Sequence, residues 1–590
     1  MKKSLIYYML SVICLASCSL DKFPLDSISP ESFFSNEEEL QAFSNGFYTM
    51  LPASSLYTDN ADTYTQNQLP DEISGLRVIP DEGGGWTWTD LRKVNTLIEY
   101  SVNCEDEDVR IKYNALARFF RAYFYYDKVR RFGDVPWYDK QLDSDSPELK
   151  KPRDSREYVM QKMIEDIDYA IENLGIGKEL YRITRWSALA LKSRFCLFEG
   201  TFRKYHDINL EGHDWKWYLE QAAAASETLM NESGYSLYTA DGPDKSYLNL
   251  FAAENAIDTE VILARDYNQA LGVFHNSNYF AIGQTNGQPG MTRKLVASYL
   301  MSDGSRFTDK EGWQEMQFYD ECQDRDPRLA QSIRTPGYMR IGGSTPVLPD
   351  FSGSVTGYQQ IKYVTTTDCD SYNISYNDLI IFRMGEVYLN FAEAKAELGT
   401  LTQDDLDRSV NLLRDRVGMP HLDLAEANAD PDPYLMSEET GYPGVSAKNS
   451  SNVGVILEIR RERTIELAQE GFRYYDIIRW KEGQAFNKQF YGMYFPGPGE
   501  YDLDGDGNAD IYLWSGTKGD SDAAVQLEIG GAIDLSEGTS GYVTPHPEKE
   551  EKWVEERDYY YPIPINDRSL TGGALTQNPG WNDGLDFEED

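Results

Sequence analysis

The chain has 590 residues, of which 97 are Asp or Glu and 56 are Lys or Arg, so its formal net charge is −41. A surface this negative repels phosphate backbones, which excludes nucleic acid as an expected partner. Beyond residue 18 the cysteines occur singly, a spacing that fits neither a zinc site nor a dense disulfide framework. The fold must therefore rest on a large apolar core.

The first 18 residues, MKKSLIYYMLSVICLASC, combine two lysines with a short apolar run from Leu5 to Ala16. The run is too short to span a bilayer, so it predicts a secretory signal and not an anchor. Its end resembles the lipobox of bacterial lipoproteins, which implies a signal peptide of residues 1–17 and acylation of Cys18. The alternative is an ordinary signal peptide in which this cysteine is incidental.

Two tryptophans follow three glycines in DEGGGWTWTD. If Thr87 caps the next helix, with Asp90 three residues on, Trp86 can pack against Leu91 as a hydrophobic staple. Trp88 then begins the helix and is expected in the core. Trp86 keeps two interpretations, the staple and an exposed platform on which a ligand stacks.

Helical periodicity is clearest in residues 114–136, NALARFFRAYFYYDKVRRFGDVP, where Gly133 and Pro136 end the run. Neighbouring helical segments joined by modest loops favour stacked hairpins of the tetratricopeptide type, although no strict period survives. We expect one large, mainly α-helical domain whose long loops carry function. Further helices are predicted at 88–100, 155–173, 184–203, 215–231, 379–398, 403–417 and 453–470, and irregular tracts at 50–86, 235–375, 420–450 and 485–560.

Residues 267–290 form a candidate binding loop that mixes flat rings with amides. This combination suits sugars, because rings cover C–H faces while amides pair with hydroxyls. An ordinary polar loop has a similar composition and is the alternative. The residues concerned are Asn276, Asn278, Tyr279, Phe280, Gln284 and Asn286.

Glutamates recur every four residues at 458, 462, 466 and 470, with arginines at 460, 461, 463 and 473 between and after them. Such a row of like charges destabilises a helix unless cations interleave, as they do here. Carboxylates on one helix beside arginines are a poor fit to a glycosidase acid pair, which faces across a cleft. We therefore expect half-buried, mutually dependent ion pairs that hold the fold.

The stretch YDLDGDGNADIYLW has the spacing of a calcium loop, because alternate side-chain oxygens can converge on one hard cation. Position twelve is Leu513, where a glutamate is expected, so an Asp-rich hairpin turn is an equal alternative. The possible calcium ligands are Asp502, Asp504, Asp506, Asn508 and Asp510.

Seven blocks along the chain resemble the SusD/RagB family, the nutrient-binding surface lipoproteins of Bacteroidetes. Their colinear order is far more specific than any single block. The blocks are SLDKFP, WTDLRKVNTLIE, ARFFRAYFYYDKVRRFGDVPW, ITRWSALALKSRFCLFEG, FRMGEVYLNFAEAKAEL, ILEIRRERTIELAQEGFRYYDIIRW and YYYPIPINDRSL with LTQNPGW.

The resemblance implies a SusD-like α-helical fold with four tetratricopeptide-like helix pairs over residues 18–590, in an N-terminal part of about 18–235 and a C-terminal part of about 260–590. It implies no catalysis and, as partner, a SusC-like TonB-dependent outer-membrane transporter over which the lipoprotein sits as a lid. It also implies ligand contacts in the loop that carries Tyr57, Tyr64, Asp71 and Arg77.

Together these features predict a glycan-binding lipoprotein, tethered to the outer membrane and facing the cell exterior. Ligand capture is expected to depend on Trp86 and Tyr279, helped by Tyr64, Asp71, Arg77, Asn278 and Phe280. A RagB-like peptide-binding protein is an alternative, and the acidic surface would then favour basic peptides. A glycan hydrolase is a third possibility, although the chain has neither a G-x-S-x-G nor an H-E-x-x-H element.

Overall fold

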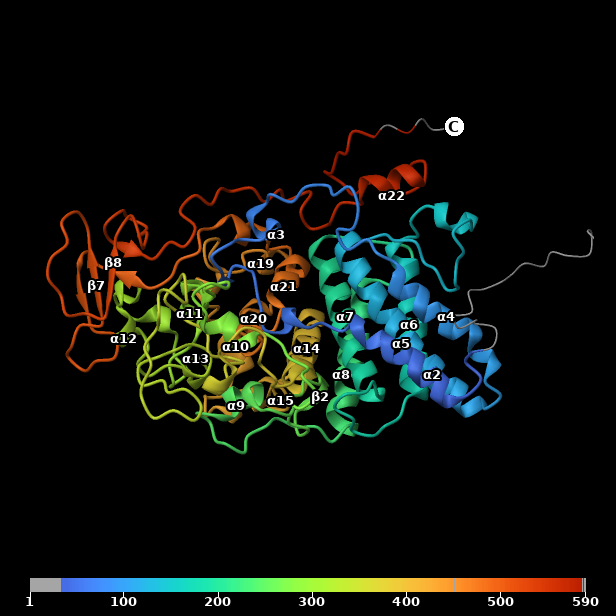
Figure 1. Cartoon of the computed structure of the whole chain (residues 1–590), viewed down its shortest axis with the longest axis horizontal. Coiled ribbons are helices and arrows are strands. Elements are labelled where there is room, and N and C mark those ends of the chain that lie inside the picture. The colour runs from blue at the N-terminus through green and yellow to red at the C-terminus, as the bar shows by residue number, and fades with distance from the viewer. Residues whose placement is uncertain (1–32, 450, 586, 588–590) are drawn as a thin grey trace, which may run out of the picture.

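The computed structural model describes residues 33–449, 451–585 and 587 (Figure 1). The predicted signal peptide and Cys18 lie outside the described residues. No described helix has the length and apolar content to cross a bilayer. The four described cysteines, Cys104, Cys196, Cys322 and Cys369, are free, in agreement with their single spacing.

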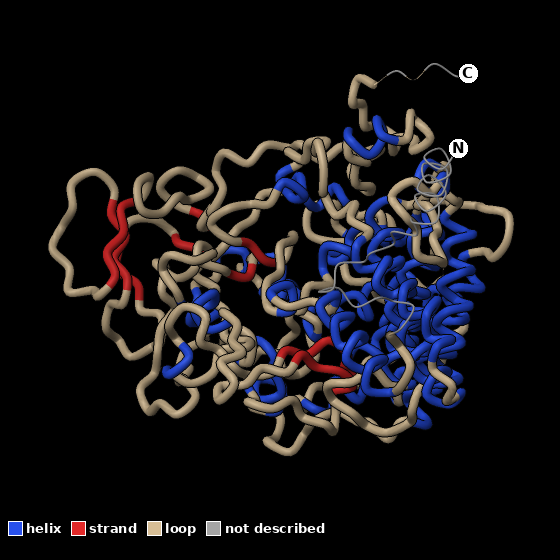
Figure 2. The backbone as a smooth tube through the Cα atoms, turned by 45° about the vertical axis from the view of Figure 1, so that its right-hand side comes forward, coloured by secondary structure: helices blue, strands red, loops and turns tan. Residues whose placement is uncertain are grey.

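Long helices build one side of the molecule (Figures 1 and 2). Successive long helices pack on one another, even where short elements intervene in the sequence: α5 contacts α4 and α6, α7 contacts α6 and α8, and α14 contacts α8 and α20. The predicted α-helical fold is confirmed, while its tetratricopeptide-like detail stays a prediction. These helices are α2 (Glu37–Ser44), α4 (Thr89–Tyr100), α5 (Glu107–Phe132), α6 (Arg156–Asn173), α7 (Arg185–Tyr205), α8 (Trp215–Glu232), α14 (Met384–Leu398), α20 (Val453–Glu466) and α21 (Arg473–Trp480).

Helix α5 shows how the sequence sets these boundaries. Asp106 caps its start by accepting hydrogen bonds from the backbone N–H groups of Asp108 and Val109. Gly133, at a φ of 73°, ends the helix. Between them Phe119 and other aromatic side chains are buried against the neighbouring helices.

The predicted helix at 379–398 is wrong at its start. Residues Leu379–Arg383 form strand β4, which pairs antiparallel with β2 (Val261–Arg265). Both strands are apolar and rich in β-branched residues, so tertiary pairing overrides helical continuation. The predicted helix at 403–417 is two short helices, α15 (Gln403–Asp407) and α16 (Val410–Arg416), separated at Ser409, whose backbone is not helical.

The other side of the molecule is made of loops, short helices and small sheets (Figure 2). The sheets pair β1 with β3, β5 with β9, and β6, β7 and β8 in that order. The strands are β1 (Tyr64–Thr65), β3 (Gly290–Met291), β5 (Tyr494–Phe495), β6 (Gly499–Tyr501), β7 (Ile511–Trp514), β8 (Val525–Glu528) and β9 (Gly541–Tyr542). The short helices include α3 (Asp71–Ser74), α9 (Ser246–Ala252), α10 (Ser277–Ile282), α11 (Arg293–Ser298), α12 (Phe318–Glu321), α13 (Pro327–Ala330), α17 (Leu424–Ala429), α18 (Pro433–Met436), α19 (Val445–Lys448) and α22 (Ile565–Leu570).

A buried ion network joins the two sides at Glu466, the last residue of α20. Arg416 donates to its carboxylate at 2.6 and 2.7 Å, Arg383 at 2.8 Å, and Arg328 lies at 3.4 Å. Burial alone would raise the pKa of Glu466, but Arg416, Arg383 and Arg328 hold it well below its ordinary value. The predicted structural role of this cluster is confirmed, and Glu466 is fully buried where we expected half-burial.

Candidate functional site

Trp86 lies in the core and not on the surface. Its side chain is 4% exposed, with the rings of Phe132 and Trp88 edge-on at centroid distances of 4.8 and 5.2 Å. Residue 88, and not Thr87, occupies the cap position of α4, and no side-chain hydrogen bond caps the helix. The exposed platform expected at Trp86 is therefore wrong, because neighbouring rings cover it.

The loop residues Tyr64 and Arg77 hold the fold together. Tyr64 is buried in β1, and its hydroxyl donates to the side-chain oxygen of Gln360. Arg77 donates to the Tyr474 hydroxyl at 2.8 Å and lies 3.9 Å above the Tyr561 ring, which fastens the C-terminal segment to this loop. These contacts occupy both side chains, so the structure corrects their expected roles as ligand contacts.

Asp71 is exposed at the start of α3 and lines a surface pocket of about 620 Å³ together with residues 545–550 and Lys552. This position remains available to a ligand. Trp86 lines a different pocket, with Trp88 and Tyr138. The structure therefore does not bring Asp71 and Trp86 into one site.

Residues 267–290 divide into a buried set and one accessible ring. Asn278 is fully buried and accepts a hydrogen bond from the backbone N–H of Thr365 at 2.9 Å, and Phe280 is 6% exposed. The prediction that these two side chains contact a ligand is therefore wrong. Tyr279 is half-buried, and its ring lies edge-on to Tyr372 at 5.7 Å. Tyr372 is 71% exposed and was missed by the sequence analysis. Tyr279 stays a predicted binding residue.

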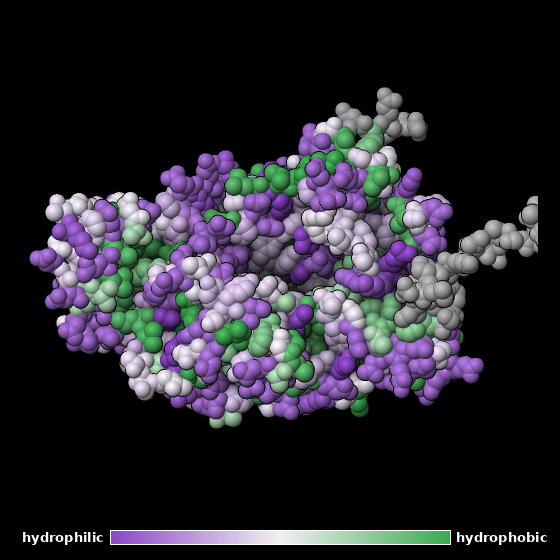
Figure 3. Space-filling model, in the orientation of Figure 1, coloured by the Kyte–Doolittle hydropathy of each residue, from purple (hydrophilic) through white to green (hydrophobic). Residues whose placement is uncertain are grey.

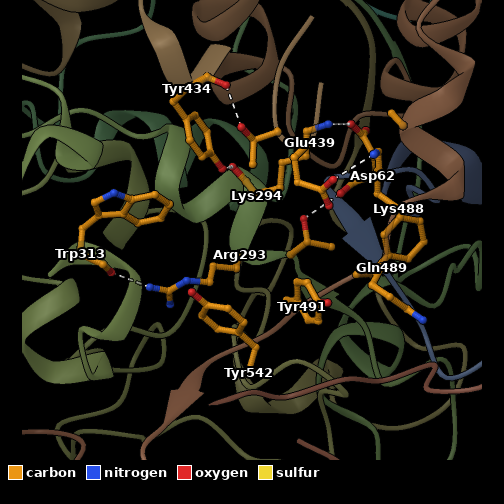
Figure 4. Close-up of a pocket in the computed structure, with 14 residues that line it drawn as sticks. Asp62, Arg293, Lys294, Trp313, Tyr434, Glu439, Lys488, Gln489, Tyr491 and Tyr542 are labelled. Atoms are coloured by element: carbon orange, nitrogen blue, oxygen red, sulfur yellow. Dashed lines mark hydrogen bonds and ion pairs between the residues drawn. The ribbon is translucent and has the colours of Figure 1, made fainter. Parts of the chain in front are cut away.

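A second group of rings lines a pocket of about 220 Å³, which we call the Trp313 pocket (Figure 4). Trp313 lies edge-on to Tyr434 at 5.6 Å, and Tyr491 and Tyr542 are tilted against each other at 5.2 Å. The molecular surface is otherwise mostly hydrophilic on the face shown in Figure 3. The lining residues are Asp62, Thr292, Arg293, Lys294, Trp313, Tyr434, Glu439, Thr440, Ala485, Lys488, Gln489, Phe490, Tyr491 and Tyr542.

The start of α11 ties the walls of this pocket together. The hydroxyl of Thr292 donates to the backbone carbonyl of Asp62 at 2.8 Å. The backbone N–H of Arg293 donates to the backbone carbonyl of Tyr491 at 2.7 Å. The Arg293 guanidinium also donates to the carbonyl of Trp313 at 2.7 Å. Because these bonds join segments far apart in sequence, the rings are held in place before any ligand binds.

Charged groups complete the Trp313 pocket. Asp62 accepts from Arg473 at 2.7 Å and from Lys294 at 2.6 Å. Burial would raise the pKa of Asp62, but these two cations hold it well below its ordinary value, so it stays ionised. At the rim Lys488 pairs with Glu439 at 2.9 Å. The pocket thus combines apolar ring faces with fixed donors and acceptors.

Sequence reasoning missed the four rings because they come from positions 313, 434, 491 and 542 and share no local pattern. A weak signal exists at Trp313, which follows Gly312 in a polar tract. Gly312 adopts a φ of 74° and so turns the chain ahead of the short 3₁₀ helix Trp313–Glu315.

The Asp-rich loop joins β6 to β7 as a hairpin. Asp502, Asp504 and Asp510 place carboxylate oxygens within 4.8 Å of one another, which fits a single cation. Asp506 lies outside this group and instead accepts hydrogen bonds from the backbone and side chain of Asn508, whose amide nitrogen is thereby engaged. The turn is confirmed, and calcium stays a prediction with three of its five predicted ligands placed together.

The protein is mainly α-helical, and its candidate binding pocket is lined largely by residues of loops and short elements. The sequence model of the SusD family matches residues 249–581. The chain belongs to the SusD family.

Relatives and solved structures agree with this assignment. SusD-like protein P2 of Formosa agariphila is 26% identical over 520 residues, covering 82% of this chain and 92% of the relative. A SusD-like protein of Bacteroides ovatus is 23% identical and covers 83% and 86%. A crystal structure of a SusD-like protein from Bacteroides fragilis superposes with a TM-score of 0.64 at 22% identity, covering 95% of this chain and 100% of that chain. A SusD-like carbohydrate binding protein from the same species superposes with a TM-score of 0.63 at 19% identity, covering 92% and 99%.

Proposed function

We propose that the protein is a cell-surface glycan-binding lipoprotein that captures an oligosaccharide or polysaccharide and delivers it to a SusC-like TonB-dependent outer-membrane transporter. The observation that carries the proposal is the ring-lined Trp313 pocket. The description of a similar solved structure as a carbohydrate binding protein supports the ligand class.

The Trp313 pocket suits a sugar for energetic reasons. Most hydroxyl contacts only replace hydrogen bonds to water and contribute little net, whereas a ring stacked on a sugar face adds apolar contact that water does not supply. A pocket of about 220 Å³ accepts only a small part of a long chain. We expect weak binding by a single protein, which many tethered copies on one polymer would strengthen.

We further propose that Cys18 is acylated and holds the protein on the outer face of the outer membrane, because its position after the apolar run fits such processing. Membrane fractionation of Cys18→Ala tests this, since release of the variant is the expected result. We propose no enzymatic activity. Asp62 is kept ionised by Arg473 and Lys294, whereas acid catalysis at a glycosidic bond needs a carboxyl group with a raised pKa. Burial raises the pKa of Asp59 and of Glu482 to about 7, but both side chains are buried and neither lines the pocket.

Trp313→Ala is expected to weaken glycan binding at least tenfold, because it removes the largest ring of the pocket. A glycan array probed with the full-length protein would first identify a bound saccharide, and calorimetry would then compare the variant with the wild type. Trp313→Phe should keep part of the affinity, since it retains an apolar face.

Trp217→Ala is the matched control for this experiment. Trp217 is half-buried, stacks on His213 and lies outside the Trp313 pocket, so its replacement should leave glycan affinity unchanged. Binding of peptides but no saccharide by the wild type would contradict the proposed ligand class. Release of reducing ends from a bound glycan would contradict the absence of catalysis.

We also propose a weak calcium site at Asp502, Asp504 and Asp510, because carboxylates on a loop suit a large ion with irregular coordination. Added Ca²⁺ should raise the melting temperature by about one to several degrees, more than Mg²⁺ does, by binding the folded state only. Asp504→Asn should reduce the effect. Identical melting temperatures in excess Ca²⁺ and in chelator would contradict the calcium site and leave the loop as a hairpin turn.

A further inference from the structure

The charge balance of the Trp313 pocket is opposite to that of the whole chain. Acidic residues outnumber basic ones by 97 to 56 overall, yet Arg293, Lys294 and Lys488 line the pocket against Asp62 and Glu439. Arg293 is compensated from behind the lining by the buried Glu321 at 3.0 Å, so Lys294 and Lys488 are the cations that remain for a ligand. A pocket with apolar walls keeps the field of such charges strong, whereas distant surface acids are screened by salt within about 8 Å. The local field at the pocket is therefore set by these nearby groups.

Lys294 lies below the rim, and Lys488 at the rim is less exposed than its acidic partner Glu439. The side chain of Lys294 is 15% exposed and that of Lys488 is 33% exposed, whereas that of Glu439 is 62% exposed. Glu315, beside Trp313, is also exposed. Water screens the rim carboxylates more effectively than the cations inside.

The inner carboxylate does not cancel the positive charge. Asp62 is 2% exposed, and it is shared between Lys294 and the buried Arg473. One ionised carboxylate thus faces two cations, and Glu482, which also interacts with them, has its pKa raised to about 7 by burial. Lys294 has three N–H donors and its ion pair with Asp62 uses one of them, so as far as the described residues go the other two can meet a ligand at the pocket floor.

A further cation lies behind the apolar wall. The Lys549 ammonium is 5.1 Å from the centre of the Phe490 ring, and among the described residues it has no hydrogen-bond partner. Burial lowers the pKa of Lys549 to about 8, which is the response of a cation that no neighbouring carboxylate fully compensates. Phe490 belongs to the pocket lining, so this charge adds to the positive field.

We propose that the Trp313 pocket selects an acidic saccharide, whose carboxylate or sulfate group is bound by Lys294 and Lys488. This inference rests on the proposed function and names the ligand class of the same site. The rings hold the sugar face while the two ammonium groups meet the anion. The acidic group supplies what neutral glycans lack, a charge-assisted hydrogen bond inside a partly desolvated pocket.

Calorimetry with the full-length protein tests the proposal with three groups of probes. Oligogalacturonate and alginate oligosaccharides carry carboxylates, carrageenan oligosaccharides carry sulfate without carboxylate, and dextran and malto-oligosaccharides are neutral. The probes of at least one acidic class should bind at least tenfold more tightly than the neutral probes. The class that binds more tightly shows whether the pocket prefers carboxylate or sulfate. Raising NaCl from about 50 to 500 mM should weaken acidic binding only.

Lys488→Gln should lower affinity for the preferred acidic probe at least fivefold, and Lys488→Arg should restore most of it. Lys518→Gln, at an exposed lysine outside the pocket, is the control and should change nothing. Lys488 is preferred to Lys294 as the test because its only ion pair among the described residues is at the rim, so its loss should leave folding intact.

The outcomes separate this proposal from the proposed function. Preferred binding of neutral probes that Trp313→Ala abolishes would overturn the acidic ligand and keep the glycan receptor. Acidic binding that Lys488→Gln leaves unchanged would overturn the assignment of the anion to this pocket. No binding to any saccharide would overturn both.

Discussion

Replacing Glu466 with glutamine is expected to lower the free energy of unfolding by about 3 to 5 kcal/mol, the range for breaking a buried ion pair from one side. The carboxylate is fully buried and faces Arg328, Arg383 and Arg416. Removing its charge leaves three buried guanidinium groups with too few carboxylates, since Arg416 then keeps only Glu260 at 3.5 Å among the described residues. Urea denaturation monitored by tryptophan fluorescence measures the loss.

In Glu466→Gln the free energy of unfolding should also depend less on pH in the acid range. The pKa of Glu466 is lower in the folded protein than its ordinary value of 4.5, so its contribution is present above that value and is lost as the pH falls through the folded pKa. Between about pH 5 and pH 2 the wild type should lose stability more steeply than Glu466→Gln. Glu556→Gln, at an exposed glutamate, should change stability by less than about 0.5 kcal/mol. An equal loss at both positions would contradict the structural role of the network.

Gly471→Ala is expected to destabilise the protein by about 2 to 5 kcal/mol, through two separate effects. Gly471 follows α20 at a φ of 76°, where an L-residue is strained. A Cβ atom there would also lie 2.4 Å from the backbone carbonyl oxygen of Ser55, which cannot move as a flexible side chain can. Thermal melting and urea denaturation together measure the cost.

Gly530→Ala separates the two effects. Gly530 has a φ of 82°, but a Cβ atom at this position would have no neighbour within 4 Å, so only the backbone strain of about 1 kcal/mol applies. Equal losses for Gly471→Ala and Gly530→Ala would show that the contact with Ser55 is unimportant.

The helical half of the fold could be predicted from the sequence because its signals are local. The helix predicted at 155–173 is α6 (Arg156–Asn173), and the one at 215–231 is α8 (Trp215–Glu232). Their caps and apolar spacing lie within a few residues of each other. The strand at Leu379–Arg383 escaped prediction because its partner, Val261–Arg265, is more than one hundred residues away.

The binding residues could be predicted only in part, for the same reason. The sequence of a loop does not show whether an aromatic residue in it is exposed or buried, because contacts with distant segments decide this. Phe132 and Trp88 cover Trp86, whereas Tyr279 remains half-exposed. The Trp313 pocket draws its rings from four separate segments, so no single stretch indicates it.

The pair of Asp62 with Arg473 joins residues 411 positions apart, across most of the chain. Contacts that close so long a loop carry a large entropic cost and form slowly during folding. Asp62 therefore waits for Arg473, which is synthesised 411 residues later. The proposed recognition of a ligand therefore depends on nearly the whole chain, and a copy truncated before Arg473 should lack it even if its first helices had already packed.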